Sequence, residues 1–261
     1  LGLAGRIDWN LLAAFRYSKN SFSDPLEEIG LNSADVEDIS YAPSLMSYYS
    51  AEISNWLNWN GQQTYRYEQL QPSEGSLAAA ESQRHMASVS QEAQFLIEKA
   101  QLVITPSAGI ESAYSTQNAS DEPANYSDSD DTAVSYRLSL TNKSIPDTRL
   151  LINGGSASRF PSLFELFGNN GKVLGNTGLK KETSYGAEAG VIYESTMLPF
   201  PYRLRLELFG FYTEMRDLIQ FVQSAQNVSI AENIDSARIW GVESGLRSDL
   251  FGHLRLAANY T

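Results

Sequence analysis

The sequence predicts an all-β protein, namely a partial transmembrane β-barrel of antiparallel up-and-down strands. Three observations favour this fold class. Apolar and polar residues alternate with a period of two along many runs of the chain. The connections between the runs are alternately long and short, as in outer-membrane barrels with short periplasmic turns and longer external loops. Tyr and Trp gather near the ends of the runs, where amphipathic rings fit the membrane interfaces.

Composition excludes several classes of function. The 261 residues include 31 acidic and 19 basic residues, a net charge of -12, so we expect no nucleic-acid partner. The absence of cysteine excludes thiolate metal sites, disulfides and cysteine nucleophiles. His85 and His253 lie far apart in sequence and no base accompanies a nucleophile, so we expect no enzyme and no cofactor. No apolar run approaches about 18 residues, so no transmembrane helix is expected.

The N-terminal third contains three predicted strands. Residues 6–17 alternate clearly and precede a long polar segment that reaches residue 43. A second run, 45–59, is less regular and ends at Asn60-Gly61, where we predict a tight hairpin turn. A short third run, 64–69, leads into a polar segment.

The middle third repeats this rhythm. Runs 87–97 and 102–110 alternate, an acidic loop follows, and run 132–141 turns into the first arm of the segment 149–194. Pro106 conflicts with its place inside a strand because proline cannot donate a ladder hydrogen bond. We therefore expect either a bulge or a misplaced strand there.

The second arm, 182–194, shows the two faces most clearly. One face is apolar, and the other carries Glu182, Glu188 and several glycines. A helix would place Glu188 and Val191 on the same side, so the period is that of a strand. Three further runs follow, separated by a short turn, a long segment at about 220–235 and another turn. They are 203–208, 240–247 and 254–260.

We count about eleven strands in all. In a soluble sandwich the apolar faces would point into a core, whereas in a membrane barrel they point outwards to lipid and the polar faces line the lumen. The alternating loop lengths favour the barrel. The inward charges would then be satisfied by water, by one another or by a domain that fills the lumen.

Motifs for metals and catalysis are weak. Asp128, Asp130 and Asp131 lack the glycine and the closing Glu of an EF-hand, so we interpret them as a solvated acidic loop. The segment 168–172 lacks the Ser or Thr of a P-loop, and 155–158 lacks the closing Gly of a nucleophile elbow. The sequence therefore predicts no metal site.

Four motifs in order resemble the β-barrel of TonB-dependent outer-membrane receptors. They are SRFPSLFELFG at 158–168, GNTGLKKETSYGAEAGV at 175–191, FYTEMRDLI at 211–219 and NIDSARIWGVESG at 233–245. The corresponding family pieces are an Arg-x-Pro-Ser loop leading to Glu-Leu, a Gly-Asn-x-x-Leu-Lys-x-Glu strand entry and an Asn followed by a Gly-Val-Glu strand. The stretch that contains them, from Gly154 to about Gly245, covers about a third of the chain, and their order and spacing make the resemblance specific.

The resemblance implies a barrel of about 22 strands in the Gram-negative outer membrane, filled by an N-terminal plug domain. It implies active uptake of a scarce nutrient such as a ferric siderophore, with energy from the TonB complex. Residues 1–261 would be the middle of the barrel, since we identify no plug, TonB box or closing strand. The expected partners are outer-membrane lipid and lipopolysaccharide, the protein's own plug, TonB and a small-molecule or metal-chelate ligand.

Two sets of candidate site residues follow. Loop residues on a rigid barrel rim can contact a ligand. They can also pack the loop against the barrel wall, and we favour this second interpretation. The ligand-contact candidates are Arg159, Phe160, Phe164, Phe167 and Asn169. The candidates that face a plug in the lumen are Glu182, Glu188, Arg203, Arg205 and Glu243. The alternative functions are a passive porin, a surface adhesin or a secreted soluble β-rich binding domain.

Overall fold

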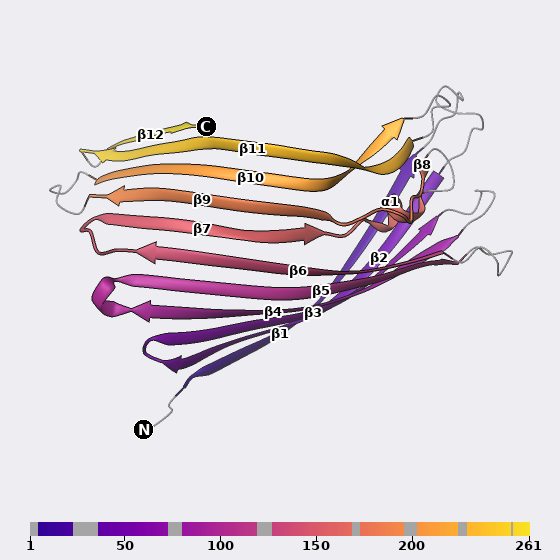
Figure 1. The fold of residues 1–261 in the computed structure, drawn as a ribbon, viewed down its shortest axis with the longest axis horizontal. Coiled ribbons are helices and arrows are strands. Elements are labelled where there is room, and N and C mark those ends of the chain that lie inside the picture. Colours follow the sequence, from indigo (N-terminus) through magenta and orange to yellow (C-terminus); the bar gives the residue numbers. More distant parts are fainter. Residues whose placement is uncertain are drawn as a thin grey trace.

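The computed structural model of the protein describes residues 5–22, 36–72, 80–118, 127–168, 173–195, 203–223, 229–251 and 253–261. One 12-stranded sheet dominates it, with the spatial order β1-β2-β3-β4-β5-β6-β7-β9-β10-β11-β12. Every pairing along this order is antiparallel, and only the short β8 pairs in parallel, with β11. The predicted all-β, up-and-down fold is confirmed (Figure 1).

The strands are long, and the described turns at 55–56, 98–101 and 143–147 lie at one end of the sheet, which we call the turn end; we call the opposite end the loop end (Figure 1). The strand bounds are β1 (Ile7–Phe22), β2 (Val36–Ser54), β3 (Leu57–Pro72), β4 (Glu81–Ile97), β5 (Leu102–Asn118), β6 (Ser127–Asn142), β7 (Thr148–Arg159), β8 (Val173–Leu174), β9 (Glu182–Glu194), β10 (Arg203–Gln223), β11 (Ser229–Leu250) and β12 (Leu254–Tyr260). A 3-10 turn, η1 (Glu98–Ala100), joins β4 to β5, and a helix, α1 (Leu163–Phe167), follows β7. The main path therefore holds the eleven strands that were predicted.

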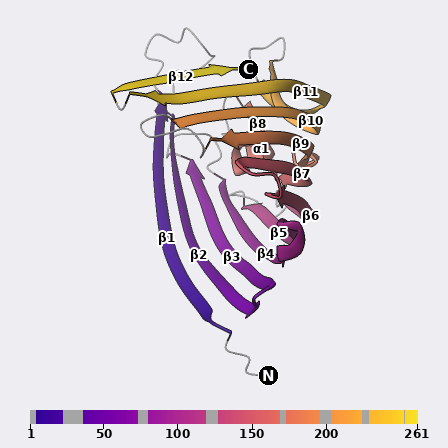
Figure 2. The ribbon, with the colours of Figure 1, turned by 90° about the vertical axis from the view of Figure 1, so that its left-hand side faces the viewer.

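The register divides the side chains into a convex outer face and a concave inner face. On β9, Val191 lies beside Leu150 of β7 and Leu208 of β10, and Glu188 lies on the opposite face. Large apolar side chains on the outer face stay exposed, among them Leu208 (50%) and Val242 (53%). Figure 2 shows the sheet curving round α1, which lies on the concave side. The predicted orientation, apolar outwards and charged inwards, agrees with a barrel wall facing lipid.

The strand bounds in the N-terminal third correct the sequence analysis. Asn60 and Gly61 lie inside β3 and pair with Ser50 and Tyr49 of β2, so the predicted hairpin there is wrong. The turn lies at residues 55–56 instead. Gly61 is needed because the Tyr49 ring lies across it, where a Cβ atom would clash with the ring. The glycine marks a close side-chain approach within a strand.

Several predicted loops are strands at the loop end of the sheet. β2 begins within the polar segment 18–43, β10 and β11 enter the segment 220–235, and β6 includes Asp128–Asp131. Beyond the apolar band, neither face of the sheet requires apolar side chains. The apolar–polar alternation therefore ends there, while the backbone hydrogen-bond ladder continues. The polar composition of these segments therefore led to predicted loops that are too long.

Pro106 lies within β5 after all. Pairing with β6 is continuous through Pro106↔Leu138, whereas pairing with β4 stops after Glu92↔Ser107 and resumes at Phe95↔Ile104. The register is the same on both sides of this interruption, so the strand is neither misplaced nor shifted. The missing amide hydrogen is accommodated by a local gap in one ladder.

No helix among the described residues has the length and hydropathy needed to cross a membrane. β1 and β12 form the two ends of the described sheet. The described part is thus an open, curved sheet rather than a closed barrel.

Candidate functional site

The motif SRFPSLFELFG folds into a capped helix on the concave face. Ser162 is the N-cap of α1: its hydroxyl accepts from the Glu165 amide at 3.2 Å, and Glu165 Oε2 accepts from the Ser162 amide at 2.6 Å. This reciprocal capping box fixes the first turn. The helix ends at Phe167 and is capped by Gly168, whose φ of 70° is suited to glycine. We call residues 160–168 and 173–181 the α1 loop.

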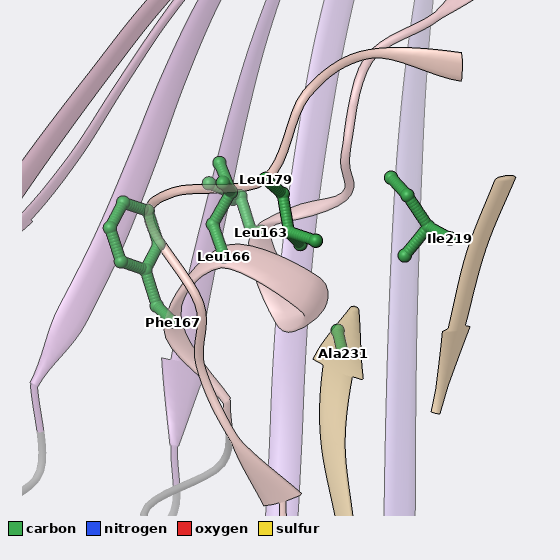
Figure 3. Packing of buried hydrophobic residues seen from close by; sticks show 6 residues of the cluster. All are labelled: Leu163, Leu166, Phe167, Leu179, Ile219 and Ala231. Atoms are coloured by element: carbon green, nitrogen blue, oxygen red, sulfur yellow. The ribbon is translucent and has the colours of Figure 1, made fainter. Parts of the chain in front are cut away.

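The α1 loop rests on a hydrophobic cluster drawn from distant strands. Leu166 is 2% exposed and Ala231 of β11 is 0% exposed. Figure 3 shows the six members of this cluster, which are Leu163, Leu166, Phe167, Leu179, Ile219 and Ala231. Leu70 of β3 packs against the same cluster. The loop therefore connects β3 to β10 and β11 across the concave side of the sheet.

Arg159 is the electrostatic anchor of the loop. Its Nε donates to Glu182 Oε2 at 2.6 Å, and its Nη1 donates to Glu165 Oε2 at 3.0 Å. Glu182 Oε1 also accepts the backbone amide of Ile219 at 2.8 Å. One guanidinium thus joins the end of β7, the helix and the start of β9, and Glu182 extends the network to β10.

The same network affects the ionisation of Glu182. Glu182 lies on the loop side of Tyr185, beyond the apolar outer band. The hydrogen bond from Arg159 lowers the pKa of the Glu182 carboxyl, partial burial opposes this, and the Ile219 amide lowers it further. The carboxylate therefore stays ionised under neutral conditions.

A buried arginine holds the other side of the loop. Arg84 of β4 is 4% exposed and donates to Ser115 Oγ at 2.8 Å and to the Pro161 carbonyl. Phe160 packs beside it with Ala113, Ala133 and Met86. Loss of either hydrogen-bond partner should therefore be costly, because the buried Arg84 guanidinium could not replace that partner with water.

Two asparagines fasten the second part of the loop. Asn176 Nδ2 donates to the Ala231 carbonyl at 2.9 Å, and Asn176 Oδ1 accepts the Gly178 amide at 3.0 Å. Asn233 Oδ1 accepts the Lys180 amide at 2.8 Å, while its Nδ2 donates to the carbonyls of Lys180 and Asp217. The Gly-Asn and Asn motifs of the sequence therefore meet in space.

The structure places the ligand-contact candidates in different environments. Phe160 and Phe167 are buried, at 7% and 6% exposure, and Arg159 is engaged by two carboxylates while its side chain stays 46% exposed. Phe164 is partly buried, with its ring 5.8 Å from that of Phe221. Asn169 lies outside the described residues. Ligand contact by any of these residues stays a prediction.

The lumen candidates share the concave face but not one site. Glu182 lies at the loop end of the sheet, and Glu188, exposed, accepts Asn153 Nδ2 at 2.7 Å farther along β9. Arg203 and Arg205 lie near the turn end, where Arg205 contacts Glu194 at 2.9 Å and also Glu207. Glu243 is exposed on β11 opposite Phe209. A shallow hollow of about 420 Å³, lined in part by Asn153, Glu188 and Phe211, occupies the middle of this face.

Among the described residues no group of three or more His, Asp or Glu could hold a metal ion. Asp131 is bound to Lys181 Nζ at 2.6 Å, which ties β6 to the α1 loop. The predicted solvated loop is thus in part a strand with a structural ion pair.

Sequence reasoning missed Arg84 and the capping role of Ser162 and Glu165. It included Asn176 and Asn233 in the quoted motifs but missed their anchoring contacts. The S-x-x-E pattern of a capping box was visible in SLFE. Arg84 had no such signal, because its partner carbonyl lies 77 residues away in sequence.

The sequence and the fold are similar to those of known proteins. The family described as TonB dependent receptor-like, beta-barrel matches residues 1–261. No curated protein sequence matches the chain.

Solved structures with the same fold include three metal-related proteins. The Serratia marcescens hemophore receptor HasR, solved as a double mutant with its hemophore HasA and heme, has a TM-score of 0.60 and 14% identity, over 94% of this chain and 47% of HasR. The FrpB iron transporter from Neisseria meningitidis, F5-1 variant, has a TM-score of 0.69 and 12% identity, over 93% and 39%. The copper transporter OprC has a TM-score of 0.72 and 14% identity, over 96% and 44%. The chain thus spans less than half of each of these proteins.

Proposed function

Because this chain belongs to the TonB-dependent receptor family, in its β-barrel portion, we propose that it forms part of an outer-membrane receptor for active nutrient uptake. The observation that carries the proposal is the α1 loop, which folds inwards and is fastened to strands on both flanks of an outward-apolar wall. Such a loop narrows the loop-side entrance. Such a fixed inward surface suits a receptor that captures scarce cargo, and loss of uptake without TonB distinguishes it from a passive pore with an inward loop.

The proposed cargo is a metal-containing nutrient, and its specific form is a ferric siderophore or a similar chelate. Support comes from the proteins of like fold, which by name concern heme, iron and copper. The family and these neighbours are transport receptors, which agrees with a protein that binds and moves cargo without chemical change.

The proposed location is the Gram-negative outer membrane. The exposed apolar outer face supports it, because isolated soluble domains rarely leave so many large apolar side chains in water. The proposed partners are surrounding lipid, including lipopolysaccharide, the plug domain and the TonB complex. We propose that five charged residues on the concave face are directed towards the plug. They are Glu182, Glu188, Arg203, Arg205 and Glu243.

For the ligand we propose a division of roles within the α1 loop. Arg159 and Phe164 keep exposed surface and can meet the ligand, and Asn169 remains a candidate from the sequence. Phe160 and Phe167 hold the loop in place through burial. Substituting Phe164 should weaken binding while leaving the loop folded, whereas substituting Arg159 should also loosen the loop, because Arg159 holds Glu165 and Glu182.

Uptake measurements test the proposal. Cells carrying the full-length gene should accumulate a radiolabelled ferric chelate under iron limitation, and deletion of TonB should abolish the accumulation. Uptake that persists without TonB would favour a passive porin. A protein that partitions into buffer without detergent would instead favour a secreted soluble domain.

A further inference from the structure

Arg137 of β6 is a cation without a partner in the middle of the concave face. The register places Ser107 of β5 on one side of it and Gly155 of β7 on the other. Its side chain is exposed, and it forms no ion pair or side-chain hydrogen bond with any residue in the ranges that the structure describes. The guanidinium donors are therefore available to an acceptor that the described residues do not supply.

Two hollows of the concave face meet at Arg137. One is the hollow of about 420 Å³ described above, which extends from Arg137 across β7 and β9 to Glu188 and Thr213. The other, of about 340 Å³, extends across β5 and β4 to Glu92 and Asn60. Each volume lies within the range that is typical of small-molecule sites. A small molecule bound at Arg137 therefore has room on both sides of the guanidinium.

Small residues keep the space beside the guanidinium open. In the row of Arg137, the next two strands contribute Gly155 and then Gly186. A Cβ atom at Gly155 would clash with the Tyr136 carbonyl oxygen and lie 3.3 Å from Arg137 Cβ, so a larger residue does not fit there without a shift. The other small side chains that line the hollows carry hydroxyl groups. They include Ser90, Ser107, Ser135, Ser184 and Thr213.

The carboxylates at the far sides of the hollows restrict the charge of a ligand. Asn60 Nδ2 donates to Glu92 Oε1 at 3.1 Å, and Asn153 Nδ2 donates to Glu188 Oε1 at 2.7 Å. Glu92 lies two strands from Arg137, which separates their backbones by about 10 Å. An anion with several charges would be repelled by both carboxylates. A single carboxylate can instead form a bidentate pair with Arg137, while neutral hydroxyls donate to the remaining lone pairs of Glu92 and Glu188.

We propose that this region is a binding site for a hydroxyl-rich acid with one carboxylate, and that Arg137 is the ligand of that carboxylate. The hydroxyls of the acid bind to the serine and threonine side chains of the hollows and to Glu92 and Glu188. A free acid and its iron chelate share this chemistry. The site is separate from the α1-loop residues that are proposed to contact cargo, and it does not rest on uptake or on TonB.

Equilibrium dialysis of radiolabelled gluconate against the intact full-length receptor in neutral detergent tests this site. Arg137→Gln should weaken binding at least about tenfold, because the carboxylate loses its charged hydrogen-bond partner. Arg137→Lys should retain part of the affinity, because it keeps the charge but not the planar fork. Arg247→Gln is the control and should bind as the wild type does. Arg247 is also an exposed arginine on the concave face, but it lies on β11 opposite Arg205 and lines neither hollow.

Competition by related small molecules identifies the chemistry that the site recognises. Sorbitol has the hydroxyls without the carboxylate, and acetate has the carboxylate without the hydroxyls. Each should therefore compete much less well than unlabelled gluconate. Ferric gluconate is compared with the metal-free acid, and the tighter of the two identifies the source of the carboxylate as a chelate or a free acid.

Two results would overturn the proposal. Equal binding of gluconate by the wild type and Arg137→Gln would show that Arg137 is not the ligand, as is expected if a carboxylate of the plug already occupies it. Equal competition by acetate or sorbitol would exclude a hydroxyl-rich acid. Circular dichroism and resistance to unfolding in unheated SDS confirm that each variant is folded. Binding through Arg137 without any iron uptake would contradict the proposed function alone.

Discussion

The strand wall and the α1 loop place their apolar side chains in opposite surroundings. On the wall, Leu208 and Val242 point outwards and are about half exposed, so they need lipid or detergent to cover them. In the loop, Leu166 is 2% exposed and is covered by the protein itself. The wall is therefore stabilised by its backbone hydrogen-bond ladder and by the lipid or detergent around it. The loop is instead stabilised by side-chain packing of the kind found in soluble proteins.

Matched leucine truncations should separate the two regions by the largest effect. Leu166→Ala should destabilise the α1 loop by about 2–5 kcal/mol, because it leaves a cavity in a closed cluster. Leu208→Ala should cost much less, because detergent or lipid fills the space. Hydrogen exchange of the full-length receptor measures both. Equal loss of protection in the two variants would show that the wall and the loop are one packed unit.

An arginine placed on the outer wall tests the lipid-facing side of the comparison. Val191→Arg should destabilise the barrel by about 2–4 kcal/mol if the residue lies near the bilayer midplane. Ser184→Arg is the control, since Ser184 lies on the same strand but on the concave face. Unfolding by urea in lipid vesicles measures the difference. Gly190 is a poor control because the Phe209 side chain covers it. A larger cost for Ser184→Arg would reverse the assignment of faces.

The wall was largely predictable because its faces follow from a local period. Glu188 and Val191 were assigned to opposite faces from alternation alone, and the structure agrees. The failures lie where local signals have two meanings. Gly61 was interpreted as a turn residue, whereas it makes room for the Tyr49 ring from the neighbouring strand. Such a contact depends on register, which the sequence of one strand does not contain.

The α1 loop was much less predictable, because its contacts join residues far apart in the chain. The resemblance located the motif, and the capping pattern at Ser162 and Glu165 was readable. The contacts of Arg84 with Pro161 and of Asn233 with Lys180 join residues 77 and 53 positions apart in the chain, so no local pattern indicates them. Apolar residues in a polar, glycine-rich connection were the remaining signal, and they are compatible with either ligand contact or packing.

Removal of the N-cap should have a smaller effect confined to the loop. Ser162→Ala should cost about 1 kcal/mol of local stability, because the Glu165 amide loses its acceptor. Ser158→Ala, on the outer face of β7, is the control and should cost little. Amide exchange within α1 gives the measurement. A comparable loss of protection in β7 of the Ser162 variant would contradict a separate loop.

The smallest expected effect concerns the point where the loop meets the wall. Because the pKa of Glu182 is lowered in the folded protein, its contribution is present at neutral pH. It is lost only as the pH falls through that lowered value, below the ordinary carboxyl value of about 4.3. Amide exchange of Ile219, corrected for its intrinsic rate, should therefore increase in this acidic range, and Glu182→Gln should remove the dependence. The Leu208 amide should stay protected throughout. If both amides lose protection together, acid opens the wall itself, and the loop cannot be treated as a separately stabilised region.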